Sequence, residues 1–178
     1  MIKICLSGLS GSGKTAIGEE IAHSMHIAHI TKASTSTYKK FVQDKEYLEH
    51  TSKVAETADA KYANDFDREI EEMSNKSDCV ISTWLSPWII SNPTVRVWLN
   101  ASLEARAERR ASTLGISKEK AMKIVEEKDR IAKAAFMDVY KIDVMDHSIF
   151  DIEINTEKVS IKESAKVIEA LVKSRIDI

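Results

Sequence analysis

Short apolar runs alternate with longer amphipathic stretches along most of the chain. The short runs have the length and residue types of buried strands, and the longer stretches repeat apolar positions every three or four residues, as helices do. The predicted strands are residues 2–7, 28–31, 78–83, 95–99 and 149–155, and the predicted helices are 15–25, 102–113, 117–140 and 160–174. Alternation of this kind favours βαβ units. We therefore expect an α/β fold in which helices cover both faces of a five-stranded parallel sheet.

The last predicted helix has the clearest pattern. Its apolar side chains share one face at Ile161, Ala165, Ile168, Leu171 and Val172. Ser160 is followed three residues later by Glu163, which is the sequence signature of a capping box at a helix start. This segment should therefore lie against the sheet with its charged face in solvent.

Two segments do not follow the alternation. Residues 32–75 contain no convincing strand, and residues 106–140 carry a dense run of charged residues. In nucleotide-binding α/β sheets such insertions lie at the carboxyl ends of the strands, where ligands bind. We therefore predict one domain, 1–178, with an acceptor-binding insert and a lid in these two segments, around a core of residues 1–31, 76–105 and 141–178. The alternative is that both segments are simply solvated helical faces.

The residues between the first strand and the first helix form a complete phosphate-binding motif. Residues 8–15 read Gly-Leu-Ser-Gly-Ser-Gly-Lys-Thr, which is the P-loop pattern with a strand before it and a helix after it. The predicted nucleotide-binding residues are Gly8, Ser10, Gly11, Ser12, Gly13, Lys14 and Thr15. Glycines bring backbone N–H groups close to phosphate, Lys14 reaches the β- and γ-phosphates as a catalytic cation, and the Thr15 hydroxyl ligates Mg²⁺. The motif predicts a three-layer P-loop NTPase fold that binds ATP and Mg²⁺.

A guanine-reading GTPase is the minority interpretation of the motif. Asn75-Lys76-Ser77-Asp78 matches the Asn-Lys-x-Asp pattern of GTPases, but it precedes the third predicted strand instead of following a late one. No Asp-x-x-Gly switch motif occurs in the sequence. The P-loop also fits a nucleotide-dependent switch without an acceptor, so this second class stays open beside a kinase.

Composition limits the partners and the location. The 178 residues carry a formal net charge of −2, which gives no support for binding to nucleic acid or to an anionic membrane surface. No apolar run approaches the roughly 20 residues that a membrane helix needs. Cys5 and Cys79 both fall in apolar strand-like runs, which favours buried, reduced thiols. We expect a cytoplasmic protein, monomer or homodimer, that acts on a small molecule.

Several further segments resemble the archaeal-type cytidylate kinases, short members of the nucleoside-monophosphate kinase family. They are residues 67–70, 98–109, 115–117, 140–143 and 151–156, together with the opening strand and the P-loop. The resemblance covers nearly the whole chain. It implies a five-stranded parallel core, an acceptor-binding helical insert and a lid that bears arginines. Carried over to this sequence, it makes Arg106 and Arg110 ATP-binding residues and Arg130 a catalytic residue.

The sequence departs from this family where the acceptor should bind. Family arginines are replaced by Thr37, Trp84, Lys128 and Ala135. Arginine is the natural bidentate clamp for phosphate, and neither indole nor methyl can replace it. We therefore favour a changed acceptor, a small phosphorylated alcohol, over cytidylate. An offshoot of this family phosphorylates the 5-hydroxyl of mevalonate 3-phosphate, in isoprenoid biosynthesis, and this compound is the first candidate. Cytidylate is the alternative.

An alcohol acceptor needs a carboxylate to accept its proton. Asp67 is our candidate for this catalytic role, and Arg68 for binding a remote anionic group. Thr83 and Trp84, after the third predicted strand, are candidate substrate-binding residues. The alternative is that Asp67 and Arg68 form a weak ion pair on a helix surface. No acidic residue ends the third strand, so the usual Walker B carboxylate has no candidate.

Overall fold

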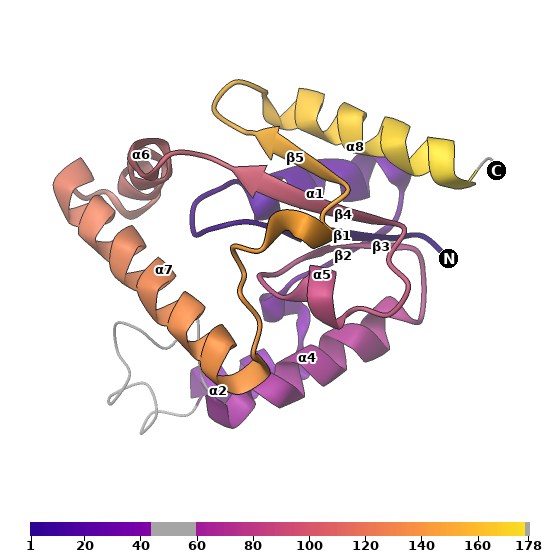
Figure 1. Cartoon of the computed structure of the whole chain (residues 1–178), viewed down its shortest axis with the longest axis horizontal. Coiled ribbons are helices and arrows are strands. Elements are labelled where there is room, and N and C mark those ends of the chain that lie inside the picture. The colour runs from indigo at the N-terminus through magenta and orange to yellow at the C-terminus, as the bar shows by residue number, and fades with distance from the viewer. Residues whose placement is uncertain (44–59, 177–178) are drawn as a thin grey trace.

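The protein has a three-layer α/β architecture in the computed structural model, which describes residues 1–43 and 60–176 (Figure 1). Its five strands are all parallel and lie in the order β2-β3-β1-β4-β5. They are β1 (Lys3–Ser7), β2 (Ala28–Ile30), β3 (Cys79–Ser82), β4 (Val95–Asn100) and β5 (Ile152–Asn155). The predicted fold class and the five predicted strands are confirmed. Strand β5 begins later than predicted because residues His147–Ile149 form a short 3₁₀ helix, η2.

Alternate side chains of the strands enter two separate cores. Ile4 and Leu6 pack with α1 (Lys14–Met25) and α8 (Ile161–Ile176), which contact each other on one face of the sheet. Cys5 faces the opposite way and packs with α4 (Ala60–Ser74) and the residue that follows α5 (Ser86–Ile89). The sheet is thus buried on both sides, as expected for a parallel sheet. Cys5 and Cys79 are buried and free, as predicted.

The capping box at the start of α8 is present as predicted. The Ser160 N–H donates to Glu163 Oε2 over 2.9 Å, and the Glu163 N–H donates to Ser160 Oγ over 3.3 Å. This exchange satisfies two backbone donors that a helix start leaves open. Across residues 1–43 and 60–176, no helix combines the length and the apolar character that crossing a membrane requires.

The remaining helices surround the carboxyl ends of the strands. Helices η1 (Lys32–Ser34) and α2 (Ser36–Gln43) follow β2, and α6 (Leu103–Leu114) and α7 (Lys118–Tyr140) form an antiparallel pair after β4. In Figure 1, α7 runs from α6 toward α2 and α4. The predicted insert thus contains η1, α2 and α4, and part of it lies outside the described residues. The predicted lid contains most of α6 and all of α7. That these segments act as acceptor site and lid stays a prediction.

Candidate active site

The P-loop connects β1 to α1 in a conformation that glycine makes possible. Gly8, Gly11 and Gly13 have φ angles of 147°, 83° and 100°, a region that other residues rarely adopt. A Cβ atom on Gly8 would lie 2.4 Å from the Leu99 carbonyl oxygen, and one on Gly11 would lie 2.9 Å from the Arg106 carbonyl oxygen. The loop therefore packs too closely against β4 and α6 for any side chain. It ends at the amino terminus of α1, where the helix dipole favours an anion.

The Lys14 side chain curls back over the loop. Its ammonium donates to the carbonyl oxygens of Gly8 and Leu9, over 2.5 and 3.0 Å, and lies 5.1 Å from the centroid of the Trp84 ring. Burial lowers the pKa of Lys14 to about 7; the charge of Asp129 opposes this shift, and that of Arg106 adds to it. An incoming phosphate would supply negative charge and so favour the charged form of Lys14.

The donor groups of the loop fit the phosphates of ATP. The backbone N–H groups can form an anion nest, and Ser12 Oγ is buried without a hydrogen-bond partner among the described residues. Thr15 lines the adjoining cavity, where its hydroxyl could ligate Mg²⁺. Strand β3 ends at Ser82, where many P-loop proteins carry the Walker B carboxylate. The Ser82 hydroxyl donates to the Lys14 carbonyl oxygen over 3.1 Å. The role of Thr15 as a metal ligand stays a prediction.

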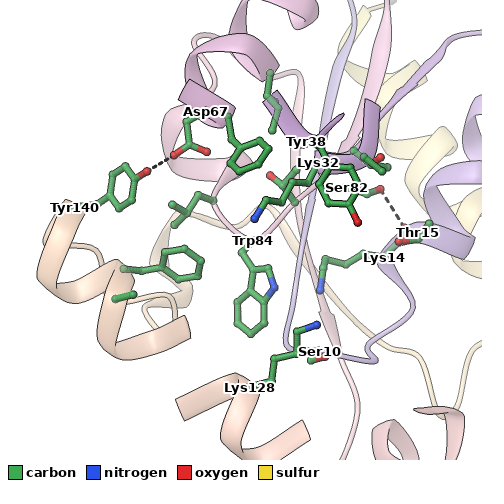
Figure 2. Close-up of a pocket in the computed structure, with 18 of the residues that line it drawn as sticks. Ser10, Lys14, Thr15, Lys32, Tyr38, Asp67, Ser82, Trp84, Lys128 and Tyr140 are labelled. Carbon is green, nitrogen blue, oxygen red and sulfur yellow. Dashed lines mark hydrogen bonds between the residues drawn. The ribbon is translucent and has the colours of Figure 1, made fainter. Parts of the chain in front are cut away.

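A cavity of about 620 Å³ opens beside the P-loop (Figure 2). Its walls come from segments far apart in the sequence: the P-loop, residues 31–33, α4, residues 82–85 and α7. Thr83 and Trp84 line it, as does Asp67. These three predicted acceptor-site residues therefore lie around one space, next to Lys14 and Thr15 of the donor site.

One wall of the cavity is aromatic. The Trp84 ring lies 5.8 Å from that of Phe136, and Phe136 lies 6.5 Å from Tyr140, measured between ring centroids. On another side Lys32 Nζ lies 4.2 Å from the centroid of Phe66. Trp84 and the neighbouring Ala135 occupy positions where the resembled family carries arginines, so the cavity has the apolar surface there that the sequence predicts. No sequence motif indicates a role for Lys32 or Phe66.

Asp67 and Tyr140 pair at the end of the cavity away from the P-loop. The Tyr140 hydroxyl donates to Asp67 Oδ2 and thereby joins α4 to the last residue of α7. Burial raises the pKa of Asp67, although the bond from Tyr140 and the charge of Lys32 oppose the shift. Figure 2 shows Lys32 and Trp84 between this pair and Lys14. This position suits a group that holds the far end of an acceptor better than a base beside the transferred phosphoryl group.

No arginine lines the cavity, although all seven arginines of the sequence lie within the described residues. Its cations are Lys14, Lys32 and Lys128. Arg68 is exposed and pairs with Asp65 and Glu72 on the surface of α4, over 3.3 and 3.9 Å. Arg68 therefore does not line the cavity in this structure, and its role in binding the acceptor stays a prediction.

The predicted lid arginines do not line the cavity, although Arg130 borders a shallow neighbouring pocket that shares Ala135 and Asp138 with it. Arg130 is exposed and pairs with Glu127 over 2.7 Å. Arg110 lies on α6, and its Nε is buried without a hydrogen-bond partner among the described residues. Neither residue lines the cavity. Their roles in catalysis and ATP binding stay predictions, which require movement of the lid.

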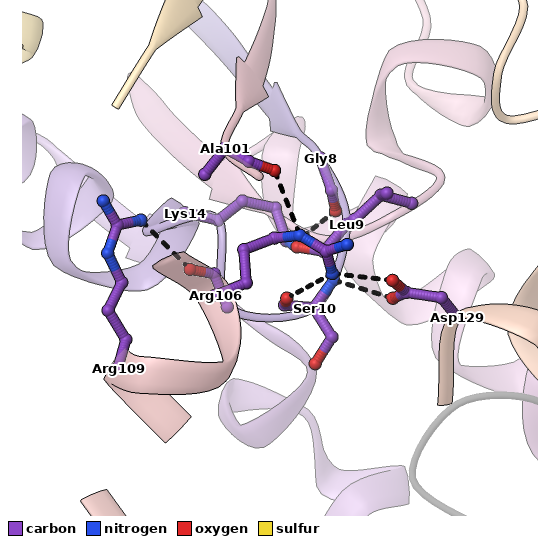
Figure 3. Close-up of polar contacts among 9 residues, drawn as sticks. Gly8, Leu9, Ser10, Lys14, Ala101, Arg106, Arg109 and Asp129 are labelled. Carbon is purple, nitrogen blue, oxygen red and sulfur yellow. Dashed lines mark hydrogen bonds and ion pairs between the residues drawn. The ribbon is translucent and has the colours of Figure 1, made fainter. Parts of the chain in front are cut away.

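Arg106 contacts the P-loop (Figure 3) and does not line the cavity. Its Nη1 donates to Asp129 Oδ2 over 2.6 Å and to the Ser10 carbonyl oxygen over 3.0 Å. Asp129 Oδ1 accepts from the Ser10 N–H over 3.1 Å. Both charged side chains are buried, with 6 and 9% of their surface exposed. Sequence reasoning missed Asp129 because it lies in the charge run 126–130, whose simplest interpretation is a solvated helix face.

Comparison with known proteins agrees with this architecture. Residues 3–158 match the cytidylate kinase-like family. The cytidylate kinase of Pyrococcus horikoshii is 32% identical over 98% of this chain and 88% of its own length. The relatives favour cytidylate over a non-nucleotide acceptor, and they give no support to mevalonate 3-phosphate.

Solved structures with the same fold include kinases of different kinds. Shikimate kinase from Bacteroides thetaiotaomicron superposes with a TM-score of 0.61 and 17% identity over 97% of this chain and 98% of its own. Deoxyadenosine kinase from M. mycoides gives a TM-score of 0.59 and 14% identity over 97% and 100% of the two chains. At these identities the likeness establishes the fold alone. With the family match and the P-loop geometry, the chain belongs to the cytidylate kinase-like family and is an ATP-dependent kinase.

Proposed function

We propose that this kinase transfers the γ-phosphoryl group of ATP to the hydroxyl of a small, already phosphorylated acceptor that is not a nucleotide. The hydroxyl oxygen would form the new bond to phosphorus as the bond to the ADP oxygen breaks, and the hydroxyl proton would pass to an oxygen of the transferred phosphoryl group. The acceptor would lie in the cavity between the P-loop and the Asp67–Tyr140 pair. Lys14 would neutralise the charge that develops between the β- and γ-phosphates, and Thr15 would hold Mg²⁺. Water exclusion would come from closure of α6 and α7 over the cavity.

The observation that carries this proposal is the absence of arginine from the cavity lining within the described residues. The rest of the acceptor-side segment does not change it, because residues 40–64 contain no arginine in sequence. A nucleoside monophosphate presents a dianionic phosphate as the nucleophile, and bidentate arginines hold and screen such a group best. An alcohol nucleophile is neutral and does not need this clamp. Lysines suffice for a remote phosphate, because they bind it as point charges.

Different residues along the cavity would bind different parts of the acceptor. Trp84 and Phe136 would pack against the carbon skeleton of the acceptor, because the cavity presents their apolar rings there. Lys32 or Lys128 would bind the phosphate that the acceptor already carries. Asp67, oriented by Tyr140, would accept a hydrogen bond from a polar group at the far end. Mevalonate 3-phosphate, a phosphorylated alcohol of this size, remains the first compound to try.

Cytidylate is the second candidate, and the family match favours it. Descent and cavity chemistry thus indicate different acceptors for the same donor site. If the acceptor is cytidylate, Arg110 and Arg130 would have to reach its phosphate after a movement of α6 and α7. Among the described residues, no arginine lines the cavity before such a movement.

An acceptor panel tests the proposed activity. ADP formation would be followed with ATP alone, with nucleoside monophosphates and with phosphorylated alcohols. We expect one phosphorylated alcohol to stimulate ADP formation well above the rate with ATP alone, and Lys14→Ala to abolish the stimulation. Slow ADP formation that no acceptor changes would contradict the proposal and support a nucleotide-dependent switch.

A further inference from the structure

Three consecutive backbone carbonyls of the P-loop are held by side chains from outside the loop. The Ser10 carbonyl oxygen accepts from Arg106 Nη1 over 3.0 Å. The Gly11 carbonyl oxygen accepts from Arg109 Nη1 over 3.1 Å, and the Ser12 carbonyl oxygen accepts from Thr156 Oγ1 over 3.0 Å. The three donors come from α6 and from the residue after β5.

The contacts bear on phosphate binding through the geometry of the peptide bond. In a planar trans peptide, the C=O and the N–H of the next residue point in opposite directions. The Ser10 and Ser12 carbonyls that are held outward therefore direct the N–H groups of Gly11 and Gly13 inward, whereas the Ser12 N–H donates to the Leu9 carbonyl oxygen over 3.1 Å. Inward N–H groups are what an anion nest requires. The outer contacts thus set the direction of the donors that would meet the phosphates.

The donors are held in two sets, Arg109 with Thr156 and Arg106 with Asp129. Arg109 Nη1 also donates to Thr156 Oγ1 over 3.1 Å, and its Nη2 donates to the Thr156 carbonyl oxygen over 2.7 Å. Arg106 is fixed by the buried pair with Asp129, whose other oxygen accepts from the Ser10 N–H. Gly11 lies directly against the Arg106 backbone, as its lack of room for a Cβ shows. Figure 3 shows Arg106 joined to both Ser10 and Asp129.

We propose that Arg106, Arg109 and Thr156 are positioning residues that orient the P-loop amides for the phosphates of ATP, with Asp129 holding Arg106 in place. They act through the loop backbone and not by contact with the nucleotide. Donors aimed in advance at developing charge need no reorganisation during the reaction, and this is where electrostatic catalysis gains its effect. The proposal concerns the ATP site alone, so it does not depend on which acceptor the kinase uses.

Thr156→Val is the first test, because valine keeps the shape and removes the hydroxyl, which contacts the Ser12 and Asn100 carbonyl oxygens and accepts from Arg109. Binding would be measured at equilibrium with ATP, with tripolyphosphate and with adenosine, in the absence of any acceptor. We expect the affinities for ATP and tripolyphosphate to fall about fivefold, the effect of one lost hydrogen bond. The affinity for adenosine should not change, because adenosine has no phosphate for the loop to hold. A purely structural role would not separate the three probes in this way.

Thr113→Val is the matched control. The Thr113 hydroxyl donates to the Arg109 carbonyl oxygen over 2.9 Å within α6, so this variant also loses one hydroxyl-to-carbonyl bond, but not one to the P-loop. We expect it to bind all three probes as the wild type does. Comparison of the two melting temperatures shows how much of any effect is loss of stability.

Arg109→Lys is the second variant, and it decides the matter if Thr156→Val fails to fold. Lysine keeps the positive charge but cannot donate to the Gly11 and Thr156 carbonyl oxygens together, as the guanidinium does. We expect the same selective loss for ATP and tripolyphosphate. Affinities for these two probes within twofold of wild type in the folded variants would overturn the proposal. An equal loss for adenosine would overturn it too.

Discussion

The donor and acceptor halves of the site are built in different ways. The donor half is one contiguous loop, residues 8–15, with glycines at left-handed φ angles and with its carbonyls held by α6 and the end of β5. The acceptor half is a cavity whose walls beyond the P-loop come from residues between 31 and 38, from α4, from residues 82–85 and from α7. Arg106 and Arg109 donate to the carbonyls of the donor loop, whereas Lys32 and Lys128 line the acceptor cavity. The nucleotide-binding residues are thus contiguous in sequence and are supported by α6 and the end of β5, whereas the acceptor-binding residues come together only when distant helices pack.

Lys14→Ala should have the largest effect of any single change, because it removes the main cation from the donor half. We expect turnover to fall by at least about 100-fold, as for loss of one stabiliser of transition-state charge. ADP formation at saturating ATP measures this. Lys166→Ala, on the exposed face of α8, is the control for loss of a lysine. Turnover within a few-fold of wild type would show that the loop does not act in catalysis.

Asp67→Asn tests the far end of the acceptor half. Because Asp67 lies away from Lys14, we expect the KM of the acceptor to rise about thirtyfold, the effect of a lost hydrogen bond to a charged group, with little change in turnover. Asp65→Asn, on the same helix but exposed, is the matched control. A general base contributes about 10²–10⁴ to the rate, so a loss of turnover in that range, with KM unchanged, would instead give Asp67 this role.

Trp84→Ala tests the aromatic wall between the two halves. The indole lines the acceptor cavity and packs against Phe136, so its loss should weaken acceptor binding more than ATP binding. Its contact with the Lys14 ammonium is the reason to measure the KM of ATP as well. We expect the KM of the acceptor to rise about tenfold, in line with the loss of one aromatic contact pair. Trp84→Phe should recover most of the affinity. A rise confined to the KM of ATP would place Trp84 in the donor half.

We expect the smallest effect from Glu69, which caps the start of α2 and should contribute to stability in a pH-dependent way. Glu69 of α4 accepts from the backbone N–H groups of Ser36 and Thr37 at the start of α2, over 2.6 and 3.0 Å. Burial raises the pKa of Glu69, but these hydrogen bonds outweigh it and lower the pKa to about 2 from 4.5. The ionised form is therefore the one that stabilises the fold. Its contribution should be complete above pH 4.5 and disappear as the pH falls toward 2.

Thermal melting between pH 6 and pH 2 would measure this contribution. Glu69→Gln should melt slightly lower than wild type near neutral pH, and the two curves should converge as the wild-type carboxylate becomes protonated. Glu72→Gln, at an exposed position on the same helix, should follow the wild-type curve. Parallel curves for wild type and Glu69→Gln over the whole range would show that this cap does not contribute.

The elements of the fold could be predicted because each depends on local sequence. Apolar periodicity locates the five strands and the long helices, and the contiguous P-loop locates the donor site. The Asp67–Tyr140 pair joins residues 73 positions apart, a distance that no local pattern encodes. Arg68 is exposed and does not line the cavity, so its role in binding the acceptor stays a prediction.

Charge alone was also a poor guide to burial. In the run 126–130 most charges belong to an exposed helix face, but Asp129 is buried against Arg106. Sequence periodicity does not reveal this exception, because the partner lies on another helix. The acceptor half is therefore where the sequence and the family match leave the substrate undecided.

The claim that the acceptor is a phosphorylated alcohol and not a nucleotide is tested most directly by measuring kcat/KM for mevalonate 3-phosphate and for CMP, each at saturating ATP and Mg²⁺. We expect kcat/KM above about 10⁴ M⁻¹s⁻¹ for mevalonate 3-phosphate and a value at least about 100-fold lower for CMP. The reverse order, with CMP above about 10⁴ M⁻¹s⁻¹, would contradict it and make the chain a cytidylate kinase whose arginines reach the acceptor only after the lid moves.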